Sequence, residues 1–280
     1  MTGSLQRLAY LVLLFTLLLC SGCVTSQKHV APGGPQVESG DKAERVWRRY
    51  VARATTADAL TGPFRISASL RYTEPSGDST RVSSLFWGNG QKASPYPLRL
   101  DLTAGIGTVV AKIREDATSF VAYSPDEKTA YTSDRGDRTL VSFGVPIPFT
   151  LGDLSLLLTG HGSSLLLPSV PTTDSGVPPV NRPTQDGVAY TLAGTKLAGI
   201  LELSSDGVPL SWRESGGGWA ISFEPGEANP LQPHRLRIAH PQGHSALIVV
   251  RDMSRVSPPF SVGQLDLPLP PGTAVKALEP

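Results

Sequence analysis

The stretch LRLDLTAGIGTVVAKI, residues 98–113, alternates apolar and polar side chains on both arms of a predicted hairpin. Strict alternation is typical of an antiparallel strand with one buried face. Gly105 and Gly107 suit the backbone of a tight turn, but Ile106 between them is apolar where turn tips are normally polar. The stretch therefore predicts a β-hairpin. It leaves Ile106 with two possible roles, as a minor core residue folded over the sheet edge or as a side chain presented outward.

The same alternation occurs on both sides of this hairpin. Before and after it lie FRISASLRY (64–72), VSSLFW (82–87), TSFVAY (118–123) and KTAYTS (128–133). From residue 189 it returns in AYTLAG, AGILELS, PLSWRES, GWAISFEP, HRLRIAH and SALIVVRD, which are separated by glycine-rich turn signals. We expect roughly eleven strands. So many sequential antiparallel strands predict a mainly β protein, an incomplete, half-open antiparallel barrel with helices available as a lid.

Helical spacing is confined to the start and the middle of the chain. Val46, Tyr50 and Val51 predict a helix over about 42–57, and residues 135–142 are short and weakly helical. In PFTLGDLSLLLTG (148–160), Thr150 is a candidate N-cap. The apolar face of this second helix must lie against other apolar residues. Its members are Leu151, Leu154, Leu157 and Leu158.

The N-terminus predicts export and lipidation. Residues 8–20 are thirteen mostly apolar residues after the single basic residue Arg7, which fits a secretory signal better than a membrane-spanning helix. Ser21 and Gly22 before Cys23 resemble the lipobox of bacterial lipoproteins, although Cys20 stands where leucine is usual. The alternative is a soluble secretory signal with an incidental cysteine. Val24 in place of aspartate predicts the outer membrane under the enterobacterial sorting rule.

These signals divide the chain into four parts. We expect a signal peptide over 1–22, a lipidated flexible tether over 23–40, the half-barrel domain over 41–255 and a proline-rich C-terminal extension over 256–280. Within the domain, residues 169–187 are expected to form a mobile surface loop. In the extension, LDL (265–267) is a candidate edge strand.

Composition excludes several classes of protein. No cysteine follows Cys23, so the exported domain forms no internal disulfide. Removal of residues 1–22 takes away only Arg7, which leaves 24 basic and 24 acidic side chains. This balance does not favour nucleic acid as a partner. We expect a monomer.

Motifs of catalysis are missing from the sequence. It contains no GxSxG, HExxH or phosphate-binding loop, and no pair of carboxylates stands out as acid and base. His240 and His244 flank the turn PQG but lack a third ligand, and GHGSS (160–164) is explained as a glycine helix cap. The RGD at 135–137 is best explained by chance. We expect no enzyme activity, no cofactor and no metal.

Several segments, in order, resemble one family, the outer-membrane lipoprotein receptor LolB with its periplasmic relative, the carrier LolA. The resemblance begins at Phe86-Trp87, continues through residues 98–113 and is strongest at FGVPIPFTLGDLSLLLTG (143–160). It implies a half-open barrel closed by helices. It also implies that triacylated lipoproteins are received from a LolA-like carrier and inserted into the outer-membrane bilayer. The family's protruding apolar residue, used for that insertion, aligns with Ile106 in the loop Gly105–Gly107.

The resemblance further implies an apolar cavity for acyl chains. Its expected lining comes from the alternating strands and the lid helix, namely Phe64, Ile66, Leu70, Trp87, Leu98, Leu100, Leu102, Phe120, Tyr131, Leu154 and Leu158. The alternative is that these side chains fill a solid barrel. A filled barrel would favour a structural or assembly lipoprotein of the envelope without lipid transfer. Two features depart from the family: Ala104-Gly105 replaces its usual asparagine-proline, and the charge balance offers no bias for docking a carrier.

Overall fold

One sheet contains all fourteen strands of the described chain. The computed structural model describes residues 36–56, 62–90, 97–134, 139–167 and 179–278. Contacts divide the chain into a unit Met1–Val37 and a unit Glu38–Pro280. The sheet belongs to the second unit, and only Gln36 and Val37 of the first are described, as the start of helix α2 (Gln36–Thr56).

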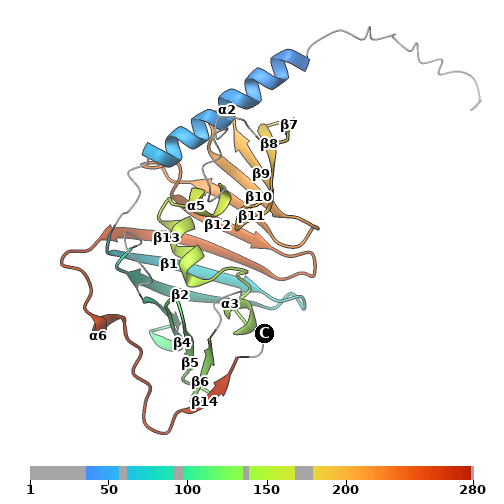
Figure 1. Cartoon of the computed structure of the whole chain (residues 1–280). Helices are drawn as coiled ribbons and strands as arrows, with labels where there is room; N and C mark the ends of the chain where they lie inside the picture. The colour runs from blue at the N-terminus through green and yellow to red at the C-terminus, as the bar shows by residue number, and fades with distance from the viewer. Residues whose placement is uncertain (1–35, 57–61, 91–96, 135–138, 168–178, 279–280) are drawn as a thin grey trace, which may run out of the picture. The chain divides into compact units, whose positions relative to one another are not determined.

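The strand order is β14-β6-β5-β4-β3-β2-β1-β13-β12-β11-β10-β9-β8-β7, and its two ends are not joined (Figure 1). Every described pairing is antiparallel except that of β14 with β6. The expected half-open, mainly β fold is confirmed. The first strands are β1 (Phe64–Thr73), β2 (Ser79–Gly88), β3 (Leu98–Ala104), β4 (Thr108–Glu115), β5 (Phe120–Ser124) and β6 (Thr129–Ser133). The others are β7 (Asn181–Pro183), β8 (Gly187–Leu192), β9 (Gly199–Ser204), β10 (Pro209–Glu214), β11 (Ala220–Pro225), β12 (Pro233–Ala239), β13 (Ser245–Arg255) and β14 (Ala274–Ala277).

Three expectations about the sheet need correction. The count of roughly eleven strands is too low, because β7 and β14 are short and lack apolar alternation. Residues 169–187 are not entirely loop, since Asn181–Pro183 pairs with β8; residues 168–178 lie outside the described residues. The candidate strand at 265–267 is wrong, because Leu265 ends helix α6 (Val262–Leu265) and the edge strand comes later, at Ala274–Ala277.

Cross-strand register explains the buried face of the sheet. Ile66 pairs with Phe86, Phe86 with Leu100, Leu100 with Ile113 and Ile113 with Ala122, so one apolar row crosses five strands. All five side chains are buried. Because side chains alternate across a strand, this register fixes which residues face the helices.

The sheet bends around helix α4 (Leu151–Leu158). This helix contacts both β3 and β12, which are four steps apart in the strand order. In a flat sheet four steps would separate those strands by about 19 Å, which is more than a helix of about 10 Å diameter can bridge. The two halves of the sheet must therefore curve toward each other, with α4 between them.

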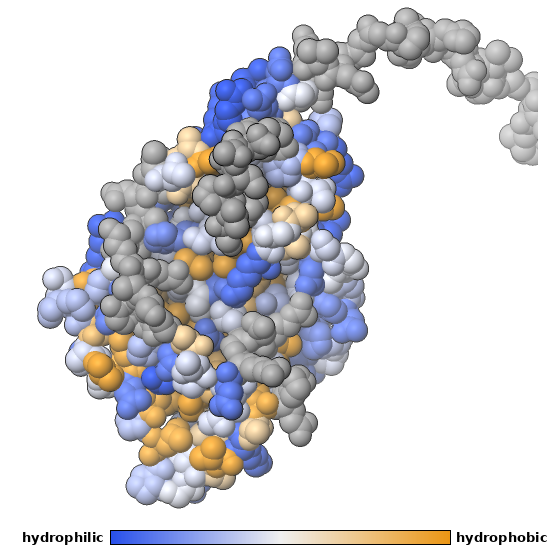
Figure 2. Space-filling view, in the orientation of Figure 1, coloured by the Kyte–Doolittle hydropathy of each residue, from blue (hydrophilic) through white to orange (hydrophobic). Residues whose placement is uncertain are grey.

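The remaining helices are α2, α3 (Thr139–Ser142), α5 (Ser163–Leu166) and α6. The expected helix over 42–57 is present but starts earlier, and position 57 is outside the described part. Helix α2 buries Ala43, Val46, Trp47 and Tyr50, and the Tyr190 hydroxyl donates to the carbonyl of Ala43 at 2.6 Å. The exposed side of α2 is hydrophilic (Figure 2). Among the described residues, no helix combines the length and the apolar character needed to cross a bilayer.

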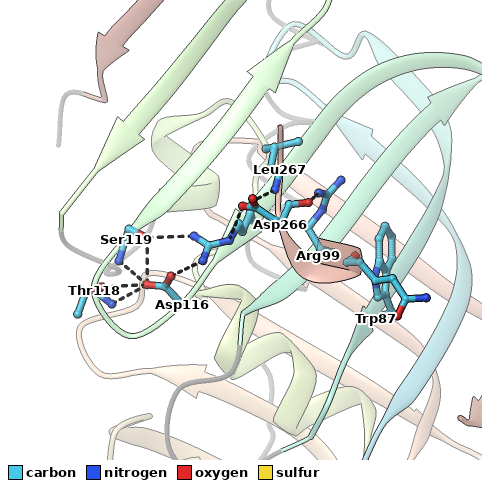
Figure 3. A network of polar contacts seen from close by, with 9 residues as sticks. Trp87, Arg99, Asp116, Thr118, Ser119, Asp266 and Leu267 are labelled. Carbon is cyan, nitrogen blue, oxygen red and sulfur yellow. Dashed lines mark hydrogen bonds and ion pairs between the residues drawn. The ribbon is translucent and has the colours of Figure 1, made fainter. Parts of the chain in front are cut away.

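The outer face of the first half carries a second row, in which Arg65 pairs with Trp87, Trp87 with Arg99 and Arg99 with Arg114. Three arginines in one row, two of them adjacent, need partners to offset their repulsion and desolvation. Figure 3 shows Arg99 donating to the backbone carbonyl of Asp266 while it lies over the Trp87 ring, 5.3 Å from the centroid. Arg114 bonds to Asp116 at 2.8 Å.

Besides Asp101 and Asp116, which form ion pairs with Arg99 and Arg114, the C-terminal extension supplies partners for this outer row. Figure 1 shows this segment, in red, running from β13 past the first half of the sheet to the β6 edge. Phe260, Leu265 and Leu267 are buried against the molecule, and the Trp87 indole N–H donates to Gln264 O at 3.2 Å. The extension is thus an integral layer of the fold.

Asn89 holds the extension by two hydrogen bonds, which yields a test. Its Nδ2 donates to Phe260 O at 2.9 Å, and its Oδ1 accepts from Phe260 N at 2.8 Å. Asn89→Ala should lower the local stability of residues 258–266 by about 1–2 kcal/mol, at about 1 kcal/mol for each bond. Hydrogen exchange of the Phe260 and Leu265 amides should accelerate by roughly tenfold or more.

Asn181→Ala is the matched control, because the side-chain amide of Asn181 donates to Pro179 O at 3.1 Å, within its own segment. It should leave exchange in the extension unchanged. Equal exchange rates in wild type and Asn89→Ala would show that the extension is held by other contacts.

Candidate functional site

Helix α4 has the features of a lid that is fixed at both ends. Thr150 caps its N-terminus by accepting from Asp153 N at 3.0 Å, and Asp153 accepts from Thr150 N in return, which confirms the predicted N-cap. At the other end His161 N donates to Leu156 O and Gly160 N to Leu157 O, with Gly160 at φ +86°. This is the hydrogen-bond pattern of a Schellman cap and confirms the predicted glycine cap.

A buried acid from the sheet completes the N-terminus of α4. Glu115, at the end of β4, accepts from Leu151 N at 3.0 Å and from Gly152 N at 2.9 Å. Burial raises the pKa of Glu115 to about 7, against the opposing effect of these two amide bonds. The first turn of the lid is therefore held by a carboxyl group that titrates near neutral pH.

The same turn is tied to the other half of the sheet. Lys196, in the connection between β8 and β9, forms an ion pair with Asp153 at 2.6 Å. The Asp153 side chain is 8% exposed and that of Lys196 is 52% exposed. Glu115 and Lys196 thus anchor one turn of α4 to the two opposite halves of the sheet.

Most of the predicted cavity lining lies on the inner face. Nine of the eleven side chains belong to one buried core cluster, and they are Phe64, Ile66, Leu70, Leu98, Leu100, Leu102, Phe120, Leu154 and Leu158. Tyr131 is on the same face but only half-buried at its rim, where its ring meets Phe143 edge to face and its hydroxyl donates to Glu127. Trp87 is a correction, because its register with Arg65 and Arg99 puts it on the outer face.

The nine buried side chains pack against one another in this structure. Of the two pockets described, neither is lined by any member of the predicted set. The larger, of about 520 Å³, lies at the start of α4. Its walls come from the α4 turn, the β8–β9 connection and the ends of β10 and β11, as Pro148, Phe149, Thr150, Asp153, Lys196, Leu197, Ala198, Trp212, Glu214, Ser215 and Trp219.

The hairpin tip has the geometry that its sequence suggested. Ala104 pairs with Thr108, so Gly105, Ile106 and Gly107 form a three-residue turn, with the glycines at φ +53° and +87°. The Ile106 side chain is fully exposed, at 106% relative accessibility. The alternative, in which Ile106 folds back over the sheet edge, is wrong.

Some predicted features are not described by the structure. Cys23, the signal peptide and most of the tether fall outside the described residues, as does the RGD at 135–137. His240 N donates to His244 O in their turn. Within the part of the chain that is described, no group of three or more His, Cys, Asp or Glu side chains could hold a metal ion.

Comparisons with known proteins concern the fold. No protein-family model matches the chain, and no curated protein matches it. A DUF1329 family protein from Desulfovibrio piger matches with a TM-score of 0.52 at 12% identity, over 80% of this chain and 97% of that one. A putative outer membrane lipoprotein-sorting protein domain from Vibrio parahaemolyticus matches with a TM-score of 0.50 at 10% identity, also over 80% and 97%.

The chain has the LolA/LolB-like fold. A LolA superfamily protein from Nitrosomonas europaea matches less well, with a TM-score of 0.46 at 12% identity over 78% of this chain and 94% of that one. At such identities the likeness concerns the LolA/LolB-like fold alone and carries over no residue's role.

Sequence reasoning missed the polar residues around the lid. Glu115, Asp153 and Lys196 were not distinguished from solvated surface charges. One signal was present for Glu115, because it follows Ile113 by two positions and so falls on the apolar face of its strand. The partners of Glu115 could not be deduced, since Leu151 is 36 residues away in the chain.

The raised pKa of Glu115 predicts a specific dependence of stability on pH. On folding this pKa rises from 4.5 to about 7, so the folded state binds the proton more tightly between those values. The free energy of unfolding should therefore fall as pH rises from about 5 to about 8, by on the order of 3 kcal/mol. Glu115→Gln should remove this decrease, as measured by urea unfolding at several pH values.

The measurement to compare is the difference in the free energy of unfolding between wild type and Glu115→Gln at each pH. Burial lowers the pKa of His161, which by itself makes the free energy of unfolding rise with pH in both proteins. Glu74→Gln, at an exposed turn position, is the control and should keep the wild-type profile. Parallel profiles for wild type and Glu115→Gln would contradict the assignment of this titration to Glu115.

Proposed function

We propose that this protein is a non-enzymatic, LolB-like lipoprotein that binds the acyl chains of triacylated lipoproteins and helps to insert them into the outer membrane. In this proposal Cys23 anchors the protein to the periplasmic face of that membrane, and a LolA-like periplasmic carrier delivers the cargo. The observation that carries the proposal is the fully exposed Ile106 at the end of a hairpin of the LolA/LolB-like fold.

An exposed isoleucine on a glycine-flanked turn suits contact with a bilayer. Gly105 and Gly107 have the positive φ angles of a tight turn, and apart from their chain neighbours no atom lies within 4 Å of where a Cβ would stand on either glycine. Burial of one isoleucine in hydrocarbon contributes about 1.5–3 kcal/mol. That amount favours reversible insertion of the tip and is too small to anchor the protein, a role left to lipidated Cys23.

The lid and the inner face suit acyl chains. Each CH₂ group exposed to water costs about 0.8 kcal/mol, so a triacylated cargo has to pass from one apolar site to another. The inner face offers such a site if α4 moves, because the leucines of α4 cover it with apolar contacts that acyl chains can replace. Movement of α4 would require the Glu115 and Lys196 contacts at its first turn to open and the contacts of its leucines with the inner face to be replaced.

A second function is favoured by the packing. The nine buried side chains of the predicted lining fill the inner face as it stands. A protein whose lid never opens would be a structural or assembly lipoprotein of the envelope, acting through its surface alone. The two functions differ in whether acylated cargo is taken up.

Ile106→Glu separates insertion from binding. Full-length protein in liposomes would receive a labelled triacylated lipoprotein from its carrier, and transfer of label into the bilayer would be followed. The variant should still bind the cargo but deliver it at least about tenfold more slowly, since tenfold corresponds to about 1.4 kcal/mol of lost apolar insertion.

Val262→Glu is the matched control. Val262 is also highly exposed, at 82%, but lies on α6, so its replacement should leave delivery unchanged. Absence of cargo uptake by folded wild type would overturn the transfer function and favour the scaffold. Equal delivery by Ile106→Glu and wild type would overturn the role of the tip.

A further inference from the structure

The hydroxyl group of Tyr50, on α2, is buried without a partner. Tyr50 is 1% exposed, and no described residue forms a hydrogen bond with its hydroxyl oxygen. A hydroxyl that is removed from water without a compensating hydrogen bond costs free energy, and most buried polar side-chain atoms in proteins are paired. Tyr190 shows the usual arrangement, because its hydroxyl is also buried and donates to Ala43 O at 2.6 Å. The stability of the fold therefore does not explain the hydroxyl of Tyr50.

Tyr50 lines a small cavity at the C-terminal end of the lid. The cavity has a volume of about 20 Å³ and lies where α2 meets the end of α4, helix α5 and strands β10, β11 and β12. Leu157 of α4, Leu166 of α5 and Phe223 of β11 supply apolar wall. This volume admits one group of the size of a water molecule, such as the oxygen of a carbonyl. Because Leu157 and Leu166 belong to the helices over the inner face, the lid movement of the proposed function would enlarge the cavity.

The lining offers a ligand one buried donor in apolar surroundings. Prolines have no backbone N–H to donate, and four of them line the cavity, namely Pro209, Pro225, Pro230 and Pro233. Among the described lining residues, Tyr50 alone has a buried side-chain polar atom that lacks a partner. Burial raises the pKa of Tyr50, so the hydroxyl keeps its proton at neutral pH and can donate it.

We propose that the Tyr50 hydroxyl donates a hydrogen bond to an ester carbonyl of the bound lipid, at the point where an acyl chain begins. An ester brings an acceptor and no donor, which matches a cavity that is apolar except for one donor. An amide carbonyl fits less well, because its N–H would need an acceptor of its own. The inference rests on the proposed function and deepens it, since it names the residue that distinguishes an acyl chain from an alkyl chain.

Ester and ether forms of one ligand test the proposal. The mature chain with Cys23→Ser, which lacks only the lipid, would be titrated with a fluorescent triacylated lipopeptide supplied from cyclodextrin. The second ligand has ether-linked alkyl chains of equal length in place of the two ester-linked chains. Fluorescence polarisation should show that this protein binds the ester form about tenfold more tightly, which corresponds to about 1.4 kcal/mol.

Tyr50→Phe removes the hydroxyl and keeps the ring. This variant should bind the ester and ether forms with equal affinity, and its affinity for the ether form should be unchanged. Without ligand it should be more stable, with a Tm higher by about 2–4 °C, because an unpaired buried group has been removed. A gain of stability together with a loss of affinity identifies a group that serves binding.

Tyr190→Phe is the matched control. Both tyrosines are buried and both rings lie against Trp47, with centroids 5.6 Å away for Tyr50 and 5.0 Å away for Tyr190. Tyr190→Phe removes an existing hydrogen bond, so it should lower the Tm. It should keep the tenfold preference for the ester form.

Three results would overturn the proposal: equal binding of the two forms by the protein with Tyr50 intact, a preference for the ester that persists in Tyr50→Phe, or a lower Tm for Tyr50→Phe. The last result would show that the hydroxyl is already satisfied, for example by a buried water. Equal binding of both forms would leave lipid uptake, and with it the proposed function, in place. Absence of uptake of either form would overturn both.

Discussion

The first turn of α4 depends on a buried carboxylate for its attachment to the sheet. Four amides at the start of any helix lack partners within the helix, and a buried helix end cannot leave them to water. Thr150 satisfies one of them and Glu115 satisfies two, at 2.9–3.0 Å. Without Glu115, a helix with seven of its eight residues buried would have unpaired donors inside the protein. The leucines of α4 can close the inner face only because this end is satisfied.

Two kinds of contact hold α4 in place. Apolar contacts keep the leucines on the inner face, but such contacts are not directional. The Glu115 and Lys196 contacts fix the position at which the helix begins. Burial of the Glu115 carboxyl opposes its ionised form, which raises its pKa to about 7, although two amides favour that form. In the proposed function, this attachment has to open before acyl chains can reach the inner face.

The two edges of the sheet are protected from pairing with other chains in different ways. On one side the C-terminal extension adds β14 to β6 and covers the arginine row of the outer face. Asn89 holds this extension by two hydrogen bonds to Phe260. On the other side the edge strand β7 has only three residues and contains Pro183, which limits pairing with other chains. An open sheet of fourteen strands would otherwise expose two long edges. Closure into a full barrel, which would remove the edges, would leave no opening for α4.

The sequence by itself determined the class of fold, the lid helix and the unusual tip, because each of these features depends on the pattern of neighbouring residues. Alternation in residues 98–113 predicts the hairpin, the leucines after Thr150 predict the helix, and glycines on both sides of Ile106 predict an exposed turn. Period alone could not place Trp87, since both Phe86 and Trp87 are apolar and only the register with Ile66 and Arg65 decides which one faces inward. Nor could it find the pocket or the Glu115 and Lys196 attachments. Those join residues that are 36 and 43 positions apart, and they exist only because a curved sheet brings its two halves to the same turn of one helix.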